Sequence, residues 1–459
     1  MIKLVRFRKY VTPALLAVLV FGGIALSAAE APAAGAAPVA AAAPAAEINT
    51  GDTAWVLTSS ALVLMMTIPG LALFYGGLVR RKNVLSVLMQ CFFITGMVSI
   101  FWVVLGYSLA FGPDVGGKGL IGGLQWAFLT GVGLTPDSFY GTTVPHQAFM
   151  IFQCMFAVIT PALIAGAFAE RMKFAGFCVF SLLWVALVYA PVAHWVWAKG
   201  GILGAEGTLD FAGGTVVHIN AGMAALAAAL VLGKRKGYPN KISPPHNLPF
   251  AVIGASLLWV GWFGFNAGSA LSANGIAANA FVVTHIAAAT AAVTWALIDW
   301  IVNKHATVLG TITGAVGGLV AITPAAGFVS ITGALAIGAG VSAICYFFVA
   351  YLKPKFGYDD SLDAFGVHGV GGIWGALATG LFATKAVNAA GNDGLFYGNP
   401  GLFLIQLKAT VISIIFAFVM SVVLLKLVDF LIGLRVTEQS ERIGLDLTEH
   451  RESGYTILE

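Results

Sequence analysis

Charged residues are scarce in this sequence. Only 10% of its 459 residues are Asp, Glu, Lys or Arg, with 24 basic and 20 acidic side chains, whereas a soluble domain carries about 25%. This scarcity excludes a water-soluble fold, a disordered chain and a nucleic-acid binder that depends on a dense basic surface. Because 59% of the residues are apolar and the mean hydropathy is +0.90, the sequence predicts an all-α polytopic membrane protein.

Cysteine and the usual signatures of catalysis are also rare or missing. The sequence contains 4 cysteines, all within apolar runs and without CxxC spacing: Cys91, Cys154, Cys178 and Cys345. This placement is typical of small buried apolar residues rather than disulfides or metal ligands. We find no nucleophile with a base, no phosphate loop and no cofactor motif, so we expect neither an enzyme nor a cofactor or metal.

The N-terminus has the three-part pattern of a secretory signal peptide. Basic residues precede a short apolar run at residues 11–26, and small residues follow it. The run is short for a membrane span, which needs about 20 apolar residues. We therefore predict a signal peptide at residues 1–29, with an uncleaved anchor as the alternative, and a flexible Ala/Pro-rich N-terminus at residues 30–52.

Apolar windows after residue 50 predict eleven membrane-spanning helices, the eighth of which is short and rich in glycine. The predicted spans cover residues 54–79, 85–111, 147–169, 175–198, 213–233, 249–270, 277–302, 307–323, 328–352, 365–385 and 401–432. If the N-terminus lies outside, the inner loops hold twelve Lys and Arg residues and the outer loops hold three. Positive charge favours the cytoplasmic side, so we predict an outer N-terminus and a cytoplasmic C-terminus.

Two similar segments suggest that the chain contains an inverted repeat. DFAGGTVVHIN (210–220) and DAFGVHGVGG (363–372) each place an Asp before a glycine-flanked His, in the fifth and tenth spans. A five-plus-five inverted repeat followed by a long final helix would bring His218 and His368 together near the bilayer midplane. Two imidazoles without a third ligand make a poor metal site, so proton handling or hydrogen bonding to a small polar solute is the better interpretation.

Several segments resemble the signature stretches of the ammonium transporter (Amt/Mep/Rh) family, bacterial Amt type. They are TIPGLALFYGGLVRRKN (67–83), DFAGGTVVHINAG (210–222), PHNLP (245–249), GWFGFNAGSA (261–270) and FGVHGVGG (365–372). The resemblance runs from about residue 52 into the C-terminal tail. It implies a membrane domain at residues 53–433, a homotrimer, and a narrow hydrophobic pore between the inverted halves of each subunit.

Carried over residue by residue, the resemblance implies an outer site that recruits ammonium. The site would consist of Phe156, Trp197 and Ser269. Aromatic faces attract a cation by roughly 0.5 to 2 kcal/mol each, and a hydroxyl accepts a hydrogen bond. Without the family motifs, core packing would explain the aromatic residues, and a hydrogen bond to its own helix would explain Ser269. Phe152 and Gln153 lie in the same FQCMF segment.

Below this site the resemblance implies a gate and a conducting pore. Phe156 and Phe265 would stack as the gate, and His218 and His368 would line the pore as a twin-His pair. Moving a bare ammonium-sized ion into a low dielectric costs of order 20 kcal/mol in an idealised estimate. We therefore expect ammonium to lose its proton and to cross as ammonia, whereas potassium has no proton to lose. Whether the proton also crosses, through the histidine pair, is left open.

Two acidic residues precede the two histidines. Asp210 matches the family's acidic residue near the outer end of the fifth span, and Asp363 stands likewise before His368, at the cytoplasmic end. Asp210 could attract ammonium, or it could hold the backbone before its helix by accepting hydrogen bonds; for Asp363 we expect a cap or another helix-positioning role. We favour the backbone role for both.

The last segment, residues 434–459, is polar. It resembles the family's cytoplasmic regulatory tail, which helps to bind PII-type signalling proteins. We expect a bacterial inner membrane protein that conducts ammonium or ammonia, with the lipid bilayer and a PII-type protein as partners. An ammonium sensor, and a channel for another small neutral solute such as carbon dioxide or water, stay as alternatives.

Overall fold

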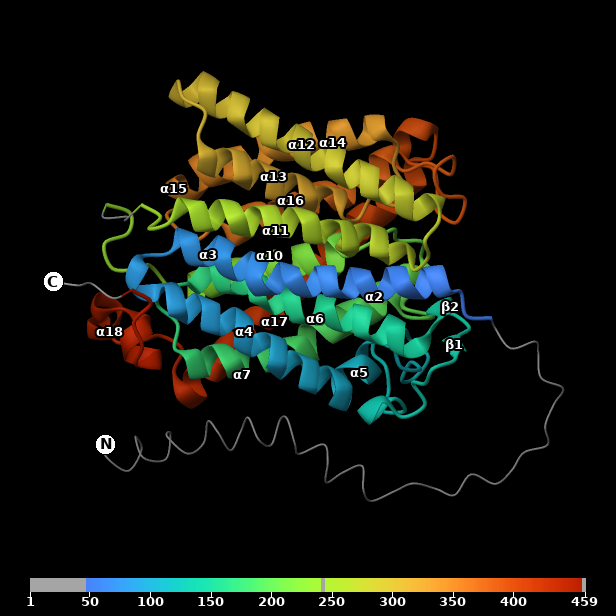
Figure 1. Ribbon diagram of the computed structural model, residues 1–459, viewed down its shortest axis with the longest axis horizontal. Coiled ribbons are helices and arrows are strands. Elements are labelled where there is room, and N and C mark those ends of the chain that lie inside the picture. Colours follow the sequence, from blue (N-terminus) through green and yellow to red (C-terminus); the bar gives the residue numbers. More distant parts are fainter. Residues whose placement is uncertain (1–46, 241–243, 456–459) are drawn as a thin grey trace, which may run out of the picture.

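The computed structural model describes residues 47–240 and 244–455. The predicted signal peptide (1–29) and most of the predicted N-terminal segment (30–52) lie outside these residues. The helices run side by side along the long axis of the molecule, with α18 of the tail at one end and the strands β1 and β2 at the other (Figure 1).

The first half of the chain forms five long apolar helices, several of which are interrupted by short π- or 3₁₀-helical turns labelled η. Its elements are α2 (Thr50–Met65), η1 (Met66–Leu71), α3 (Ala72–Leu78), η2 (Arg81–Asn83), α4 (Val84–Phe101), η3 (Trp102–Gly106), α5 (Tyr107–Phe111), η4 (Ala127–Leu129), β1 (Pro136–Asp137), β2 (Gly141–Pro145), α6 (His146–Phe168), α7 (Phe174–Trp184), η5 (Val185–Tyr189), α8 (Ala190–Trp197), α9 (Ile202–Ala205), η6 (Gly214–Ile219) and α10 (Asn220–Leu232). The two strands pair in an antiparallel manner.

The second half contains the remaining spans and the tail. Its elements are α11 (Leu248–Ala267), η7 (Gly268–Ala270), α12 (Gly275–Asn303), α13 (Val308–Ile322), α14 (Ile331–Phe347), η8 (Phe348–Leu352), α15 (Lys353–Phe356), η9 (Phe365–Gly369), α16 (Val370–Phe382), η10 (Leu395–Tyr397), α17 (Pro400–Ile432), α18 (Glu438–Ile443) and η11 (Asp446–His450).

The predicted spans agree with these helices. Within the described residues, 10 helices are long and apolar enough to cross a membrane, and Val308–Ile322 is a shorter apolar helix at the position of the weak eighth span.

Polar caps explain where several of the helices start, because a side-chain oxygen accepts a hydrogen bond from an N–H of the first turn. Asn49 accepts from Asp52, Asn247 from Phe250, Asn274 from Ile276, Thr307 from Gly310 and Asn399 from Gly401.

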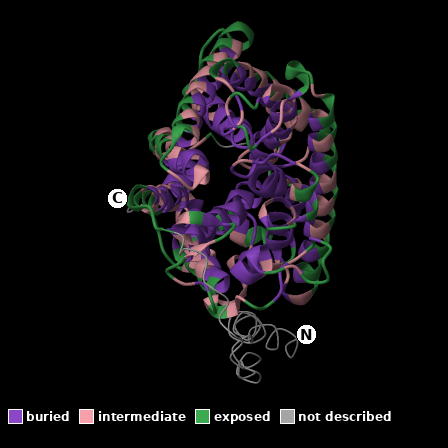
Figure 2. Ribbon diagram, turned by 90° about the vertical axis from the view of Figure 1, so that its right-hand side faces the viewer, coloured by how far each residue is buried: buried purple, intermediate pink, exposed green. Residues whose placement is uncertain are grey.

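The outer faces of the helices are apolar. Figure 2, which looks along the bundle, shows buried residues toward its centre and exposed residues on its periphery. Large side chains such as Phe92, Trp300 and Leu404 remain 62–68% exposed. Apolar side chains on the periphery suit contact with lipid.

The four cysteines are free and buried, in agreement with the prediction that they pack as small apolar residues.

The loops that carry most of the basic residues meet at one end of the bundle, called here the vestibule end. Arg80 and Arg235 both pair with Glu170, at 2.9 and 3.2 Å, and Arg235 also pairs with Asp359 at 2.8 Å. Arg171 is fully buried beside them and donates to the Asp359 carbonyl oxygen, and burial lowers the pKa of Arg171 to about 10. Four predicted inner loops are therefore joined by charge pairs.

The C-terminal tail is bound to the same end. Asp446 Oδ1 accepts from the backbone N–H of Ser86 at 2.9 Å, in the first turn of α4, and Asn83 Oδ1 accepts from the N–H of Leu445 at 2.8 Å. Glu449 accepts from the N–H of Phe174 at 3.0 Å, at the start of α7. The tail thus supplies acceptors to two helix N-termini, which favour negative charge.

Candidate functional site

A recess at the opposite end of the bundle, called here the aromatic recess, contains the predicted recruitment residues. Its volume is about 170 Å³, and Phe156, Trp197 and Ser269 all line it. The Phe156 and Trp197 rings meet edge to face, with their centroids 5.9 Å apart and their planes at 88°. The rest of the lining consists of Phe139, Tyr140, Phe149, Phe152, Gln153, Phe211 and Leu271.

Hydrogen bonds fix the polar atoms of this recess. Trp197 Nε1 donates to the Asp210 carbonyl oxygen at 2.8 Å, so the indole N–H is already occupied. Ser269 Oγ donates to the Phe265 carbonyl oxygen at 2.8 Å, one helical turn earlier. The Ser269 hydroxyl has therefore used its only proton, and its remaining lone pairs make it an acceptor.

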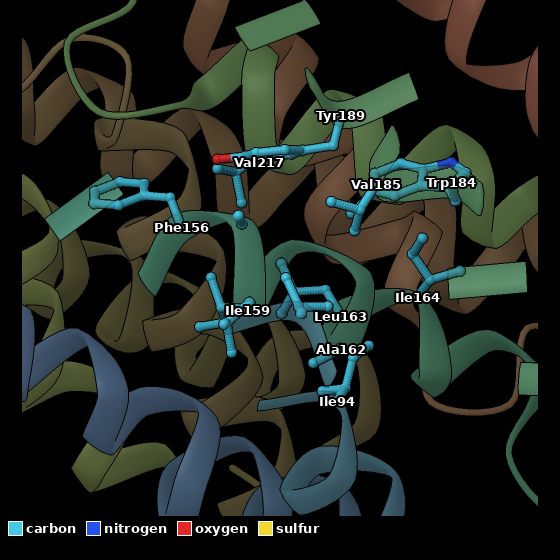
Figure 3. Packing of buried hydrophobic residues seen from close by; sticks show 14 of the residues in the cluster. Ile94, Phe156, Ile159, Ala162, Leu163, Ile164, Trp184, Val185, Tyr189 and Val217 are labelled. Atoms are coloured by element: carbon cyan, nitrogen blue, oxygen red, sulfur yellow. The ribbon is translucent and has the colours of Figure 1, made fainter. Parts of the chain in front are cut away.

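Two phenylalanines close the floor of the aromatic recess. The ring centroids of Phe156 on α6 and Phe265 on α11 lie 4.3 Å apart, with an angle of 36° between the planes, and both residues are at most 1% exposed. Beyond them is a cavity of only about 10 Å³, called here the His cavity. Figure 3 shows Phe156, Ile159 and Leu163 close to Val217. Of these residues, Ile159, Leu163 and Val217 line the His cavity.

The two predicted histidines face each other in the His cavity. His218 Nδ1 and His368 Nδ1 are 3.4 Å apart, and the rings lie within 19° of parallel. In a hydrogen bond between neutral imidazoles only one of the two facing nitrogens carries the proton. A hydrogen bond between the two Nδ1 atoms therefore requires different tautomers in the two rings. His218 Nε2 has no hydrogen-bond partner among the described residues and is available to a small solute.

Aromatic packing fixes the orientation of His218. Its ring stacks on Trp262, with centroids 5.4 Å apart and an angle of 22°, and on Phe265, at 5.9 Å and 26°. Trp262 is itself fixed, because its Nε1 donates to Thr323 Oγ1 at 2.9 Å. No role was predicted for Trp262 from the sequence. The available signal was its position three residues before Phe265, on the same face of α11.

Glycines allow the two histidine segments to cross closely. A Cβ added to Gly222 would lie 2.2 Å from the backbone of Gly369, and one added to Gly372 would lie 3.0 Å from the His218 Cβ. Side chains at these positions would hold the two segments apart. The short distance between the two histidine rings therefore depends on the glycines around them.

Asp210 organises the segment that carries His218. Its Oδ1 accepts from the N–H groups of Gly213 and Gly214, at 2.9 and 2.6 Å, and its Oδ2 accepts from Thr215 and Val216, at 2.9 and 3.1 Å. Burial raises the pKa of Asp210, and the four N–H donors oppose that rise. Both carboxylate oxygens are engaged by backbone, which supports the backbone role favoured for this residue.

The corresponding acid in the second segment is Asp360, and the prediction of a capping role for Asp363 is wrong. Asp360 accepts from the N–H groups of Ala364 at 3.1 Å and Phe365 at 2.8 Å, whereas Asp363 forms an ion pair with Lys353 at 2.6 Å. Asp363 lies three residues too late along the chain to reach those donors. Asp210 precedes His218 by eight residues and Asp360 precedes His368 by eight, so the two segments match better than expected.

A wide vestibule of about 430 Å³ lies beyond the histidines, at the vestibule end. Its walls include Asp299, Tyr346 and Asp363, and it shares Phe74, Val316 and His368 with the His cavity. The aromatic recess, the phenylalanine pair, the histidine pair and the vestibule therefore follow one another through the bundle. The structure brings all the predicted recruitment, gate and pore residues into this series.

Comparisons with known proteins agree on one family. The Ammonium Transporter Family profile matches residues 54–455. The chain is 54% identical to an ammonium transporter of Bacillus subtilis (strain 168), over 88% of this chain and 98% of the relative. It is 46% identical to ammonium transporter Amt1 of Archaeoglobus fulgidus, over 89% of this chain and 100% of the relative.

Solved structures have the same fold. The crystal structure of Candida albicans Mep2 matches with a TM-score of 0.80 and 37% identity, over 86% of this chain and 88% of the other. A solved protein described as Sensor Amt Protein matches with a TM-score of 0.79 and 30% identity, over 87% of this chain and 98% of the other.

Proposed function

The chain belongs to the Ammonium Transporter Family, and from that premise we propose that it recruits ammonium in the aromatic recess, removes its proton and conducts ammonia between His218 and His368. The chain is a membrane transporter and not an enzyme. The observation that carries the proposal is the order of the parts: aromatic recess, phenylalanine pair, histidine pair and wide vestibule.

The chemistry of the aromatic recess supports recruitment of a cation. Phe156 and Trp197 offer aromatic surface, and a cation held near such a face gains roughly 0.5 to 2 kcal/mol. Ser269 Oγ is left as an acceptor because its proton is donated to Phe265. Ammonium brings only N–H donors, so it complements this hydroxyl.

The narrow path beyond the phenylalanines supports passage as ammonia. The His cavity holds only about 10 Å³ and is lined mainly by apolar side chains. A charged, hydrated ion would lose its water there at an idealised cost of order 20 kcal/mol. Neutral ammonia avoids that cost, while potassium cannot become neutral.

The histidine pair supports hydrogen bonding to the neutral solute. His218 lines the His cavity, and its Nε2 atom has no hydrogen-bond partner among the described residues. A hydrogen bond between the two Nδ1 atoms, which are 3.4 Å apart, would hold the two rings in place. A proton could pass along the same pair by exchange of tautomers. Co-transfer of the proton is therefore compatible with this arrangement and is decided by measuring charge alongside flux.

We further propose the membrane, the orientation and the partners that the sequence predicts for the transporter. The basic loops and the tail gather at the vestibule end, and positive charge favours the cytoplasmic side. We therefore propose that the aromatic recess faces the outside of a bacterial inner membrane and that a cleaved leader precedes the membrane domain. A homotrimer and docking of a PII-type protein at the vestibule end complete the proposal.

A second candidate function is ammonium sensing. The likeness to Sensor Amt Protein, at 30% identity, favours it. A sensor requires the aromatic recess to bind ammonium but does not require flux through the His cavity. The two functions therefore differ in transport and not in binding.

Ammonium uptake by proteoliposomes tests the proposed function. Trp197→Leu removes an aromatic face of the aromatic recess and should raise KM several-fold, with a smaller change in kcat, because the lost interaction is made before the narrow path. Trp300→Leu, on the exposed outer face of α12, is the matched control. Binding of ammonium without any uptake by the wild type would favour the sensor instead.

A further inference from the structure

Gln153 lies in the aromatic recess with an unused acceptor. It is on α6, three residues before Phe156, so both side chains project from the same face of the helix. The residue is only 9% exposed, and it lines the aromatic recess. Its Oε1 atom is buried and has no hydrogen-bond donor among the described residues. A buried amide oxygen without a donor is costly and needs an explanation.

The other polar side chains of the aromatic recess are already committed. Tyr140 Oη donates to the Phe111 carbonyl oxygen at 2.8 Å and accepts from the N–H of Lys199 at 3.0 Å. The Trp197 indole N–H is donated to the Asp210 carbonyl oxygen. The side-chain acceptors left for a ligand are the hydroxyl of Ser269 and the amide oxygen of Gln153.

We propose that Gln153 is the second hydrogen-bond acceptor of the cation site and that it sets the preference for ammonium over alkylammonium ions. This inference rests on the proposed function and adds a ligand-binding residue to it. The amide can turn about its last torsion without a change in volume, because its oxygen and nitrogen are nearly equal in size. A ligand that brings only donors selects the orientation in which the oxygen faces the aromatic recess.

The number of donors explains the expected selectivity. Ammonium has four N–H groups in a tetrahedron. Gln153 and Ser269 accept two of them, and the faces of Phe156 and Trp197 receive the others. Methylammonium has three N–H groups and a methyl group, so it leaves one of these partners without a donor. Loss of the Gln153 oxygen should therefore weaken ammonium binding more than methylammonium binding.

Kinetics of ammonium and methylammonium uptake in proteoliposomes test the inference. Gln153→Leu keeps the side-chain volume and removes the amide, and a hydrogen bond to a charged group is worth roughly tenfold or more in affinity. We expect the KM for ammonium to rise by at least that factor, with kcat changed less than twofold and with a smaller rise for methylammonium. Gln153→Glu restores an acceptor with a negative charge and should lower both KM values below those of Gln153→Leu.

Gln90→Leu is the matched control. Gln90 on α4 is also buried, at 2% exposed, and its Oε1 also lacks a donor among the described residues. It does not line the aromatic recess. Its substitution should leave both KM values unchanged. An equal rise for the Gln90 and Gln153 variants, or an unchanged KM for Gln153→Leu, would overturn the inference.

A direct binding measurement separates this inference from the proposed function. If the wild type shows no ammonium uptake, the transport proposal fails. Calorimetric titration of ammonium chloride into the detergent-solubilised wild type and Gln153→Leu then tests Gln153 alone. Tighter binding by the wild type supports the amide as a ligand, and equal affinities contradict it.

Discussion

His218 and His368 meet through the same ring atom: their Nδ1 nitrogens lie 3.4 Å apart in nearly parallel rings. The two residues are 150 positions apart in the chain. Asp210 and Asp360 hold the backbone before each of them by equivalent hydrogen bonds, from opposite ends of the bundle. The alignment of the pair is thus a product of the repeated halves and not of local sequence.

The crossing at Gly222 should tolerate no side chain. Gly222→Ala places a methyl group 2.2 Å from the Gly369 backbone, and overpacking of this kind costs about 1–3 kcal/mol or more. We expect a lower melting temperature in detergent and a loss of uptake, because the histidine rings separate. Gly96→Ala is the control, since a Cβ there meets nothing within 4 Å. A Gly222→Ala protein that is as stable as Gly96→Ala would contradict the close crossing.

Asp360 should matter more for stability than Asp363. Asp360→Asn replaces one of two accepting oxygens with an NH₂ group that faces a backbone donor, which costs about 1–2 kcal/mol. Asp363→Asn removes only a partly exposed ion pair with Lys353, which is worth less than about 1 kcal/mol. Melting temperatures of the two variants measure the difference. A larger loss for Asp363→Asn would reverse the assignment.

The pH dependence of stability provides a second readout for Asp360. Burial raises the pKa of Asp360 to about 6, against opposition from Lys353. Between about pH 4 and pH 6 the folded protein then holds a proton that the unfolded chain has released, so the free energy of unfolding should fall as pH rises through this window. The free energy of unfolding of the wild type minus that of Asp360→Asn, measured across this pH window, should show this slope. A difference that is flat across the window would contradict it.

Asp446 should hold the tail to α4. Asp446→Ala leaves the Ser86 N–H without its acceptor, at a cost of about 1 kcal/mol typical of a lost helix cap. We expect faster cleavage of the tail by trypsin, with the membrane helices intact. Glu452→Ala, at an exposed position nearby, is the control. Equal cleavage rates for both variants would mean that Asp446 does not hold the tail.

Much of the helical fold was predictable because long apolar runs admit few alternatives in a membrane. The twin histidines were also predictable, since their glycine-rich surroundings repeat. The acid of the second half was misassigned because the choice between Asp360 and Asp363 depends on which carboxylate reaches the free N–H groups. Contacts between distant segments, such as Trp262 with His218 and Asp446 with Ser86, leave no local pattern and required the structure.

The most direct test of the account records ammonium-evoked current and ammonia flux in the same proteoliposomes, with potassium as the competing ion. The wild type is compared with a His218→Ala/His368→Ala double variant and with His285→Ala, a histidine exposed on the outer face of α12. We expect the wild type and His285→Ala to move ammonium and exclude potassium, and the double variant to lose ammonium transport or to admit potassium. An unchanged ratio of ammonium to potassium transport in the double variant would contradict the role assigned to the histidine pair.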